Sequence, residues 1–154
     1  MFSLLMVNCS SIQSNQNIIK AHDFSIENKE FLNLILEAKQ DFKNKYNEFP
    51  NIIVIDFIGE KDIKIVDIIS KSYLYFNEGE EDIIDERFEG ISKINNTYVL
   101  LKNYKKHSKY NFIKFKNEKL SYEIAYGSFM NCCSHSFSYD GKFTLIESFC
   151  APDF

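Results

Sequence analysis

Apolar residues recur at helical spacing in the segment that precedes Pro50. They stand three or four positions apart and so share one face of a helix: Phe31, Leu34, Ile35, Ala38, Phe42, Tyr46 and Phe49. Ser25 can cap the start of this helix, and Pro50 ends it because proline has no backbone N–H to donate. The pattern predicts one helix between Ser25 and Pro50, packed against a sheet.

After Pro50 the apolar spacing changes to two, which is typical of strands. The segment 51–58 carries β-branched side chains on both faces and predicts a central strand. A turn over residues 59–62 leads to a second strand over 63–70, and a third, short strand is expected over 73–76.

Turn residues between alternating segments predict three further hairpins. The expected pairs are 88–94 with 97–102, 110–116 with 120–126, and 135–139 with 142–149. The last has an Asp140-Gly141 turn, which suits a type I′ turn because both central residues need positive φ. Hairpins joined in order make a meander. The expected fold class is therefore α+β, with one N-terminal helix packed on a curved antiparallel β-meander sheet of about six to nine strands.

Size and charge limit the class of protein. The 154 residues suffice for one domain and leave no room for two. The net charge is −4, and the 18 basic residues include a single arginine, Arg87. Readers of nucleic-acid sequence favour bidentate arginine contacts, so nucleic acid is not an expected partner. No apolar run approaches the length of about 20 residues that a membrane-spanning helix needs.

The first residues carry a short apolar run, Met1–Val7, followed by Asn8, Cys9 and a polar stretch. This arrangement resembles the cleavage region of bacterial lipoprotein signal peptides. The resemblance implies that Cys9 becomes the lipidated first residue of a protein anchored in the cell envelope. No lysine or arginine precedes the apolar run, so it also implies a start upstream of Met1. The alternative is a cytoplasmic protein in which this run is a buried strand and Cys9 a core residue.

On this interpretation the chain has three parts. Residues 1–9 are the end of a signal, residues 10–23 are a polar, amide-rich tether, and residues 24–154 form the single α+β domain.

Lipidation of Cys9 leaves three cysteines, which permit one internal disulfide. A two-residue turn at Asp140-Gly141 places Cys133 diagonal to Cys150, whereas a three-residue loop would make Cys132 the partner of Cys150. Buried free thiols are one alternative. A zinc site is another, with Cys132, Cys133, His135 and Cys150 as its ligands, although adjacent cysteines point to opposite faces of a strand. The prediction is a disulfide, no metal and no cofactor.

Charge is segregated along the chain. Residues 102–119 hold seven lysines and one glutamate, a local charge of +6 that could face anionic lipid or block a sheet edge. Residues 78–89 hold seven acids and one arginine, a local charge of −6. These two blocks could neutralise each other, or the acidic one could dock a basic partner. The acidic candidates for such docking are Glu78, Glu80, Glu81, Asp82, Asp85, Glu86 and Glu89.

No phosphate-binding loop, nucleophile elbow or metalloprotease motif is present. Asp56 and Asp67 interrupt apolar strands and could face either the interior or solvent. The expected function is a non-enzymatic, lipid-anchored envelope protein whose sheet domain binds another protein or an envelope component. The alternative is an immunity or inhibitor protein that neutralises a basic toxin or enzyme through segment 78–89. A small hydrolase is a third hypothesis.

Overall fold

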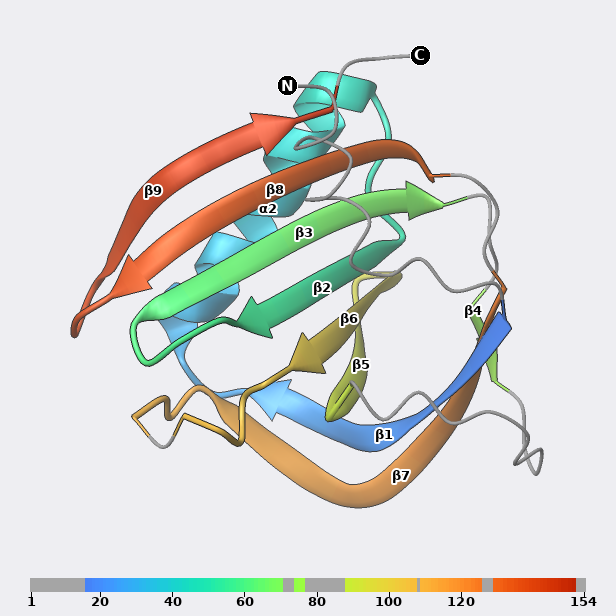
Figure 1. Ribbon diagram of the computed structural model, residues 1–154. Helices are drawn as coiled ribbons and strands as arrows, with labels where there is room; N and C mark the ends of the chain where they lie inside the picture. Colours follow the sequence, from blue (N-terminus) through green and yellow to red (C-terminus); the bar gives the residue numbers. More distant parts are fainter. Residues whose placement is uncertain (1–15, 71–73, 77–87, 108, 126–128, 152–154) are drawn as a thin grey trace.

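Nine strands and one helix make up the part of the chain that the computed structural model describes, namely residues 16–70, 74–76, 88–107, 109–125 and 129–151. Figure 1 shows the strands as one strongly curved sheet with the helix lying across it. In chain order the elements are β1 (Gln16–Ile26), α2 (Lys29–Tyr46), β2 (Ile52–Phe57), β3 (Asp62–Ser70), β4 (Leu74–Phe76), β5 (Gly90–Ile94), β6 (Thr97–Lys102), β7 (Ile113–Ala125), β8 (Phe129–Tyr139) and β9 (Phe143–Cys150).

The sheet has the order β4-β7-β1-β5-β6-β2-β3-β8-β9 and is mixed. Strand β1 pairs in parallel with β5, and β2 pairs in parallel with β6, whereas the other neighbours are antiparallel. The α+β class is therefore confirmed, but the expectation of a purely antiparallel meander is wrong. Helix α2 carries the chain from β1 across one face of the sheet, so that β2 enters beside β6 and not beside β1. Turn residues in the sequence predict pairing between strands that follow each other along the chain, and they do not predict a crossover such as the one through α2.

The predicted helix is present, with a different cap. Asn28 precedes it, and the Asn28 side chain accepts a hydrogen bond of 2.8 Å from the backbone N–H of Phe31. Ser25 is still within β1, where its hydroxyl donates to Glu27. The helix ends at Tyr46 because Asn47 adopts the left-handed conformation with φ 61° and closes the last turn, three residues before Pro50.

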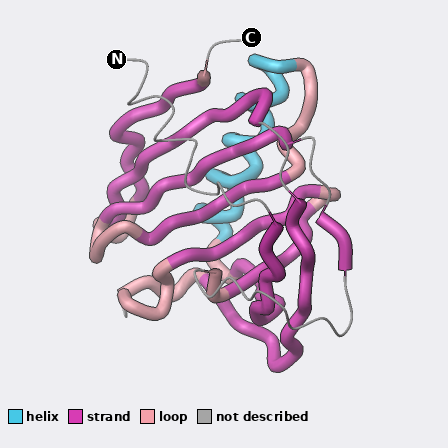
Figure 2. Tube along the Cα trace, turned by 45° about the vertical axis from the view of Figure 1, so that its right-hand side comes forward, coloured by secondary structure: helices cyan, strands magenta, loops and turns pink. Residues whose placement is uncertain are grey.

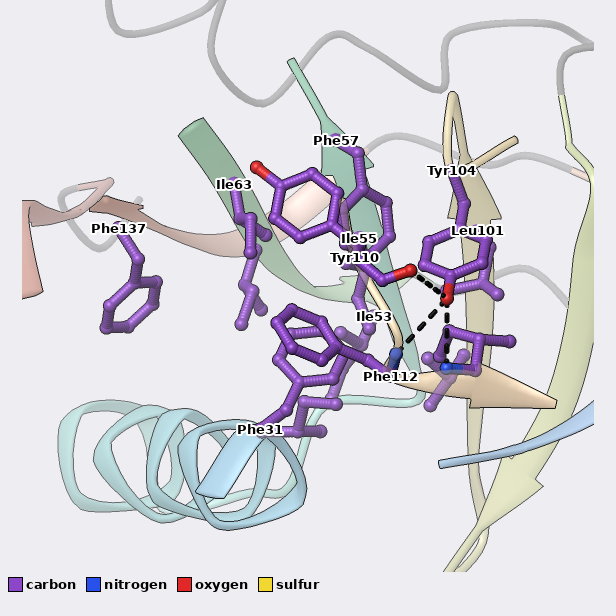
Figure 3. Close-up of a cluster of buried hydrophobic side chains, with 14 of the residues drawn as sticks. Phe31, Ile53, Ile55, Phe57, Ile63, Leu101, Tyr104, Tyr110, Phe112 and Phe137 are labelled. Atoms are coloured by element: carbon purple, nitrogen blue, oxygen red, sulfur yellow. Dashed lines mark hydrogen bonds between the residues drawn. The ribbon is translucent and has the colours of Figure 1, made fainter. Parts of the chain in front are cut away.

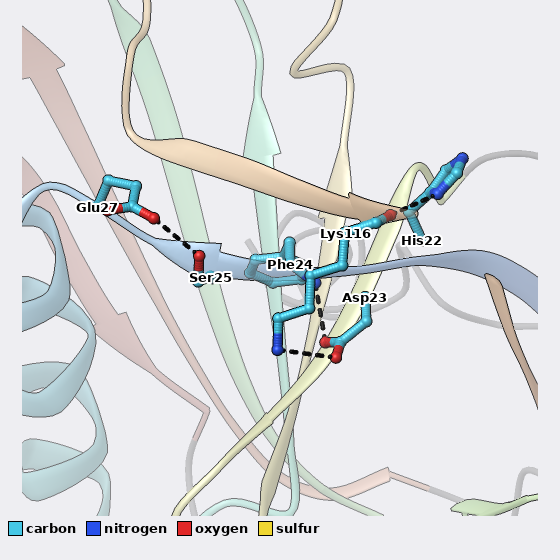
Figure 4. Close-up of polar contacts among 6 residues, drawn as sticks. All are labelled: His22, Asp23, Phe24, Ser25, Glu27 and Lys116. Carbon is cyan, nitrogen blue, oxygen red and sulfur yellow. Dashed lines mark hydrogen bonds and ion pairs between the residues drawn. The ribbon is translucent and has the colours of Figure 1, made fainter. Parts of the chain in front are cut away.

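Strand β1 includes residues 16–23, which were expected to be tether; residues 10–15 lie outside the described part of the chain. It pairs along its length with β7, and the irregularity between His22 and Phe24 is bridged by side chains (Figure 4). There Lys116 Nζ lies 3.2 Å from Asp23, and the Lys116 carbonyl lies 2.9 Å from His22 Nδ1. The polar composition of β1 concealed this pairing.

Strand β7 runs without a break from Ile113 to Ala125. The hairpin predicted at Asn117-Glu118 is therefore wrong, because β1 pairs with β7 on both sides of these two residues. The predicted two-residue type I′ turn at Asp140-Gly141 is wrong too, because Tyr139 pairs with Phe143 and, of these two turn residues, only Gly141 has positive φ. Two other predicted turns are confirmed. Strands β2 and β3 form a hairpin, and so do β5 and β6, where Asn95 and Asn96 have φ of 47° and 66°.

Apolar side chains fill both faces of the sheet. The larger cluster lies under α2, which Figure 2 shows on one side of the strands, and Figure 3 shows the cluster itself. At its edge the Tyr104 hydroxyl donates to the Tyr110 carbonyl and accepts from the N–H groups of Phe112 and Ile113. The second cluster, on the opposite face, includes Ile52, Val54 and Leu100. Strand β2 is therefore buried on both faces, as its sequence predicted.

Candidate functional site

The β8–β9 hairpin ends the described sheet and differs from its predicted register. Tyr139 faces Phe143, so the loop has three residues, 140–142, with Gly141 at φ 74°. Further along, Ser136 faces Glu147 while Phe137 faces Leu145, which leaves Ile146 as an extra residue in β9. This bulge shifts the register so that Cys133 lies directly opposite Cys150. The two form a disulfide with their Cα atoms 4.0 Å apart.

Cys132 points to the other face of β8 and is buried in the second cluster. It too is disulfide-bonded, and because Cys150 is bonded to Cys133, the alternative pairing of Cys132 with Cys150 does not form. The zinc alternative is wrong as well, because two of its four proposed ligands are bonded to each other. Over the described part of the chain, no group of three or more His, Cys, Asp or Glu is placed to hold a metal.

Strand β9 is the outer strand of the described sheet and is unusually open. Its residues 144–148 are exposed in an unbroken run. Two of them are large and apolar, with exposed fractions of 56% for Leu145 and 60% for Ile146. An outer strand presents unpaired backbone N–H and C=O groups, and proteins normally protect such strands with charge, proline or a cover. No other described strand pairs with the outer edge of β9, and this edge lies beside exposed apolar side chains.

A cleft of about 250 Å³ lies next to this strand, between α2 and the strands β8 and β9. Its apolar lining is Leu34, Ala38, Phe137, Phe143 and Leu145. Its polar lining is Glu37, Asp41, His135 and Ser148. Glu37 and Asp41 are exposed on α2, so the cleft combines apolar walls with carboxylates that reach water.

Three polar groups form a row that begins at the wall of the cleft with Ser148 and His135 and ends at the buried Asp67, one from each of the last three strands in the sheet order. The Ser148 hydroxyl lies 3.0 Å from His135 Nδ1, and His135 Nε2 lies 3.3 Å from an Asp67 carboxylate oxygen. The His135 and Asp67 side chains are 4% and 0% exposed. The contact between them lacks hydrogen-bond geometry, so that both Asp67 oxygens and His135 Nε2 have no hydrogen-bond partner among the described residues.

Burial is the main influence on the charge of Asp67. It raises the pKa of the Asp67 carboxyl group, and the nearby His135 ring and the Lys39 ammonium oppose the shift only in part. Lys39 is itself buried, which lowers its pKa, and its ammonium group donates to the carbonyls of Ile94 and Asn95. The Asp67 carboxylate is therefore a costly group that the surrounding structure leaves partly uncompensated.

Serine, histidine and aspartate in a row invite comparison with a serine hydrolase. In that mechanism the nucleophile contacts Nε2 and the carboxylate contacts Nδ1. Here Ser148 contacts Nδ1 and Asp67 contacts Nε2, without a hydrogen bond between the carboxylate and the ring. The geometry gives no support to nucleophilic catalysis by Ser148. The sequence signals for this row were that Asp67 interrupts an apolar strand and that His135 stands close to the adjacent cysteines.

The described residues show one contact between the two charged segments. Of the acidic candidates only Glu89 is described, and its carboxylate accepts a hydrogen bond of 2.9 Å from the backbone N–H of Lys105. Three members of the lysine-rich segment lie near acids elsewhere: Lys102 near Asp56, Lys109 near Glu60 and Lys116 near Asp23. Cys9 and the acidic residues 78–86 lie outside the described residues.

In the described part of the chain no helix is both long enough and apolar enough to cross a membrane. No family model, no curated protein and no solved structure matches the chain.

Proposed function

We propose that this protein is a non-enzymatic, exported envelope protein that binds another protein by pairing one of that partner's strands with β9. The observation that carries the proposal is the run of exposed residues 144–148, in which Leu145 and Ile146 expose more than half of their surface. Strand addition at an open sheet edge gives affinity through backbone hydrogen bonds and specificity through side-chain pockets. Strand β9 offers both, because its open edge adjoins the cleft.

The Cys133–Cys150 disulfide supports the exported location. Disulfides form and persist in oxidising compartments and are rare in the cytosol. This bond joins the last two strands and ties the outer strand to the rest of the sheet. An outer strand that must stay ordered while one edge is open benefits from such a link.

Membrane attachment through Cys9 is the second part of the proposal, and it has its own test. A sulfur that carries a lipid cannot also form a disulfide, so lipidation of Cys9, the fourth cysteine of the chain, and a bond between Cys9 and Cys132 exclude each other. Metabolic labelling with a fatty acid should therefore be measured in the native protein and in the Cys9→Ser and Cys150→Ser variants. Attachment predicts label in the native protein and in Cys150→Ser but none in Cys9→Ser. An unlabelled native protein would refute the anchor and leave strand pairing untouched.

Strand pairing is tested with a short neutral peptide and two matched variants. The peptide is acetyl-Thr-Val-Thr-norleucine-Thr-Val-Thr-amide with a fluorescent tag, a sequence that favours extended backbone. The variants are Ile146→Lys in β9 and Ile58→Lys beyond the end of β2, at residues of nearly equal exposure, 60% and 57%. Lysine on an outer strand discourages pairing, so Ile146→Lys should weaken binding about tenfold or more. Ile58→Lys should leave the affinity within about twofold of the native value, since a substitution away from the interface leaves its contacts intact.

Equal affinity of the peptide for the native protein and Ile146→Lys would contradict strand pairing. So would a loss of the same size in Ile58→Lys, which would show that the peptide responds to charge and not to the edge.

A further inference from the structure

We propose that the cleft between α2 and β9 receives a lysine or arginine side chain from the strand that pairs with β9. The inference rests on the proposed strand pairing and specifies which partner strands it selects. Its basis is the position of the cleft, the chemistry of its lining and the uncompensated carboxylate beneath it.

The cleft lies where a side chain of an added strand would enter. Phe143, Leu145 and Ser148 of β9 line it, so the face of β9 that looks toward α2 is also one wall of the cleft. Side chains directly opposite each other in a strand pair have Cβ atoms about 5 Å apart, and alternate residues share a face. Every second side chain of an added strand therefore points toward α2, and the one beside Leu145 meets the mouth of the cleft.

The lining matches a long cationic side chain. Lysine and arginine place their methylene stems along apolar surface and keep the charged group near water. Here the stem would lie between Ala38 and Phe137, and the charged group would reach the carboxylates of Glu37 and Asp41, which are exposed on α2. Among the described residues that line the cleft none is lysine or arginine.

The buried row below the cleft adds a second observation, a polar side chain whose oxygens lack hydrogen-bond partners among the described residues. Asp67 is fully buried, and its closest charged contact among the ion pairs of the described residues is His135 Nε2 at 3.3 Å, while Lys39, whose charge also acts on Asp67, is held by the carbonyls of Ile94 and Asn95. His135 lines the cleft and is 96% buried, and its Nδ1 is engaged by Ser148. An acidic side chain would meet Glu37 and Asp41 together, so the cleft disfavours it.

The test replaces the central norleucine of the peptide acetyl-Thr-Val-Thr-norleucine-Thr-Val-Thr-amide with lysine, arginine or glutamate. Norleucine has the stem of lysine without the charge, so the comparison isolates the ammonium group. The lysine and arginine peptides should bind at least about fivefold more tightly than the norleucine peptide, because their cationic groups form ion pairs with Glu37 and Asp41. The glutamate peptide should bind more weakly than the norleucine peptide, because its carboxylate is repelled by the same two acids.

The matched variants are Glu37→Gln with Asp41→Asn in one protein, and Glu30→Gln as control, since Glu30 is an exposed acid of the same helix outside the cleft. The double variant should bring the lysine and norleucine affinities within about twofold of each other, and Glu30→Gln should keep the preference. The proposal that the cleft selects a cationic side chain is overturned by either of two results. One is a preference for the lysine peptide that persists in the double variant, and the other is equal affinity of the native protein for the norleucine and lysine peptides.

The failure of strand pairing and the failure of the cationic preference give different results. If all peptides bind equally and all lose affinity for Ile146→Lys, strand pairing stands and the side-chain preference falls. If no peptide binds the native protein, both proposals fall together.

Discussion

Strands β2 and β9 have similar sequences and opposite environments. Strand β2 carries Ile-Ile-Val-Ile and β9 carries Thr-Leu-Ile, which are residues of high strand propensity in both. The first lies between β3 and β6 with apolar clusters on both faces, and its apolar residues are at most 1% exposed. The second has β8 as its neighbour in the described sheet and exposes five consecutive residues.

The difference indicates what each set of apolar residues is for. Those of β2 hold the domain together, because their burial removes surface from water on both sides of the sheet. In β9, Leu145 and Ile146 contribute little to the fold, since they remain largely in water. Exposed apolar residues beside an open backbone edge are a liability for aggregation unless something binds them. This contrast is the physical basis of the proposed interface.

The largest expected effect is on stability, and it should differ most clearly between β2 and β9. Ile53 in β2 is 0% exposed, and Ile53→Ala should lower the free energy of unfolding by about 4 kcal/mol, through lost burial and the cavity left behind. The same substitution at Ile146 should cost less than about 0.5 kcal/mol. Urea unfolding followed by circular dichroism measures both. Losses of similar size would show that β9 is part of the core.

The disulfide should have the next largest effect. It closes a loop with a sequence separation of 17, and the double variant Cys133→Ala, Cys150→Ala should lose about 3 kcal/mol of stability. Because the bond is at β9, hydrogen exchange should accelerate in β9 well before β2 is affected. Uniform acceleration in both strands would mean that the outer strand is not a separate unit of stability.

Gly90 tests how tightly the interior is packed. A methyl group there would lie 2.8 Å from Phe24 Cδ1 and about 3 Å from atoms of Leu101 and Phe115. Gly90→Ala should therefore cost about 2 kcal/mol. Gly59→Ala is the control, because its new methyl group would meet nothing closer than 3.8 Å. Thermal unfolding compares them, and equal melting temperatures would contradict the close approach of β1 to β5.

Asp67 lies between the two regions, on the strand next to β8, and should have the smallest effect on stability. Burial raises its pKa, so the folded state holds its proton more tightly than the unfolded state does. The contribution of Asp67 to the free energy of unfolding is therefore fully present below the unfolded-state pKa of about 3.9. This contribution is lost as the pH rises through the pKa of Asp67 in the folded state. Asp67→Asn should be more stable than the native protein by about 1 kcal/mol at neutral pH.

The pH dependence of the stability difference between Asp67→Asn and the native protein is the control. The gap between Asp67→Asn and the native protein should shrink toward zero as pH falls to about 4, because both then carry a neutral side chain at this position. Urea unfolding at several pH values measures the gap. A gap that widens toward low pH would contradict the raised pKa.

Local patterns in the sequence predicted the elements that depend on neighbours along the chain. The helix follows from the spacing of Phe31, Ile35 and Phe42, and the β5–β6 turn follows from two adjacent asparagines. The buried strand β2 follows from its β-branched residues on both faces. Each of these depends on side chains a few residues apart, which a periodic pattern reports directly.

Features that depend on distant pairing were missed. The polar strand β1 is ordered by β7, about one hundred residues later, and no local signal marks that partner. The candidate site also depends on pairing between distant parts of the chain, since Asp67, His135 and Ser148 come from three strands. Their alignment depends on the bulge at Ile146, which moves Ser148 opposite His135 and Cys150 opposite Cys133. A shift of one residue in that strand would have separated both pairs.

The central claim, that β9 is the binding edge, is tested most directly by amide hydrogen exchange. The exchange rates of residues 144–148 and of β2 should be measured by NMR with and without saturating peptide, using the lysine form of acetyl-Thr-Val-Thr-Lys-Thr-Val-Thr-amide. Strand addition predicts that alternate amides within 144–148, those that face away from β8, become protected while β2 is unchanged. Protection that falls elsewhere in the sheet, with the β9 amides unaltered, would contradict the account.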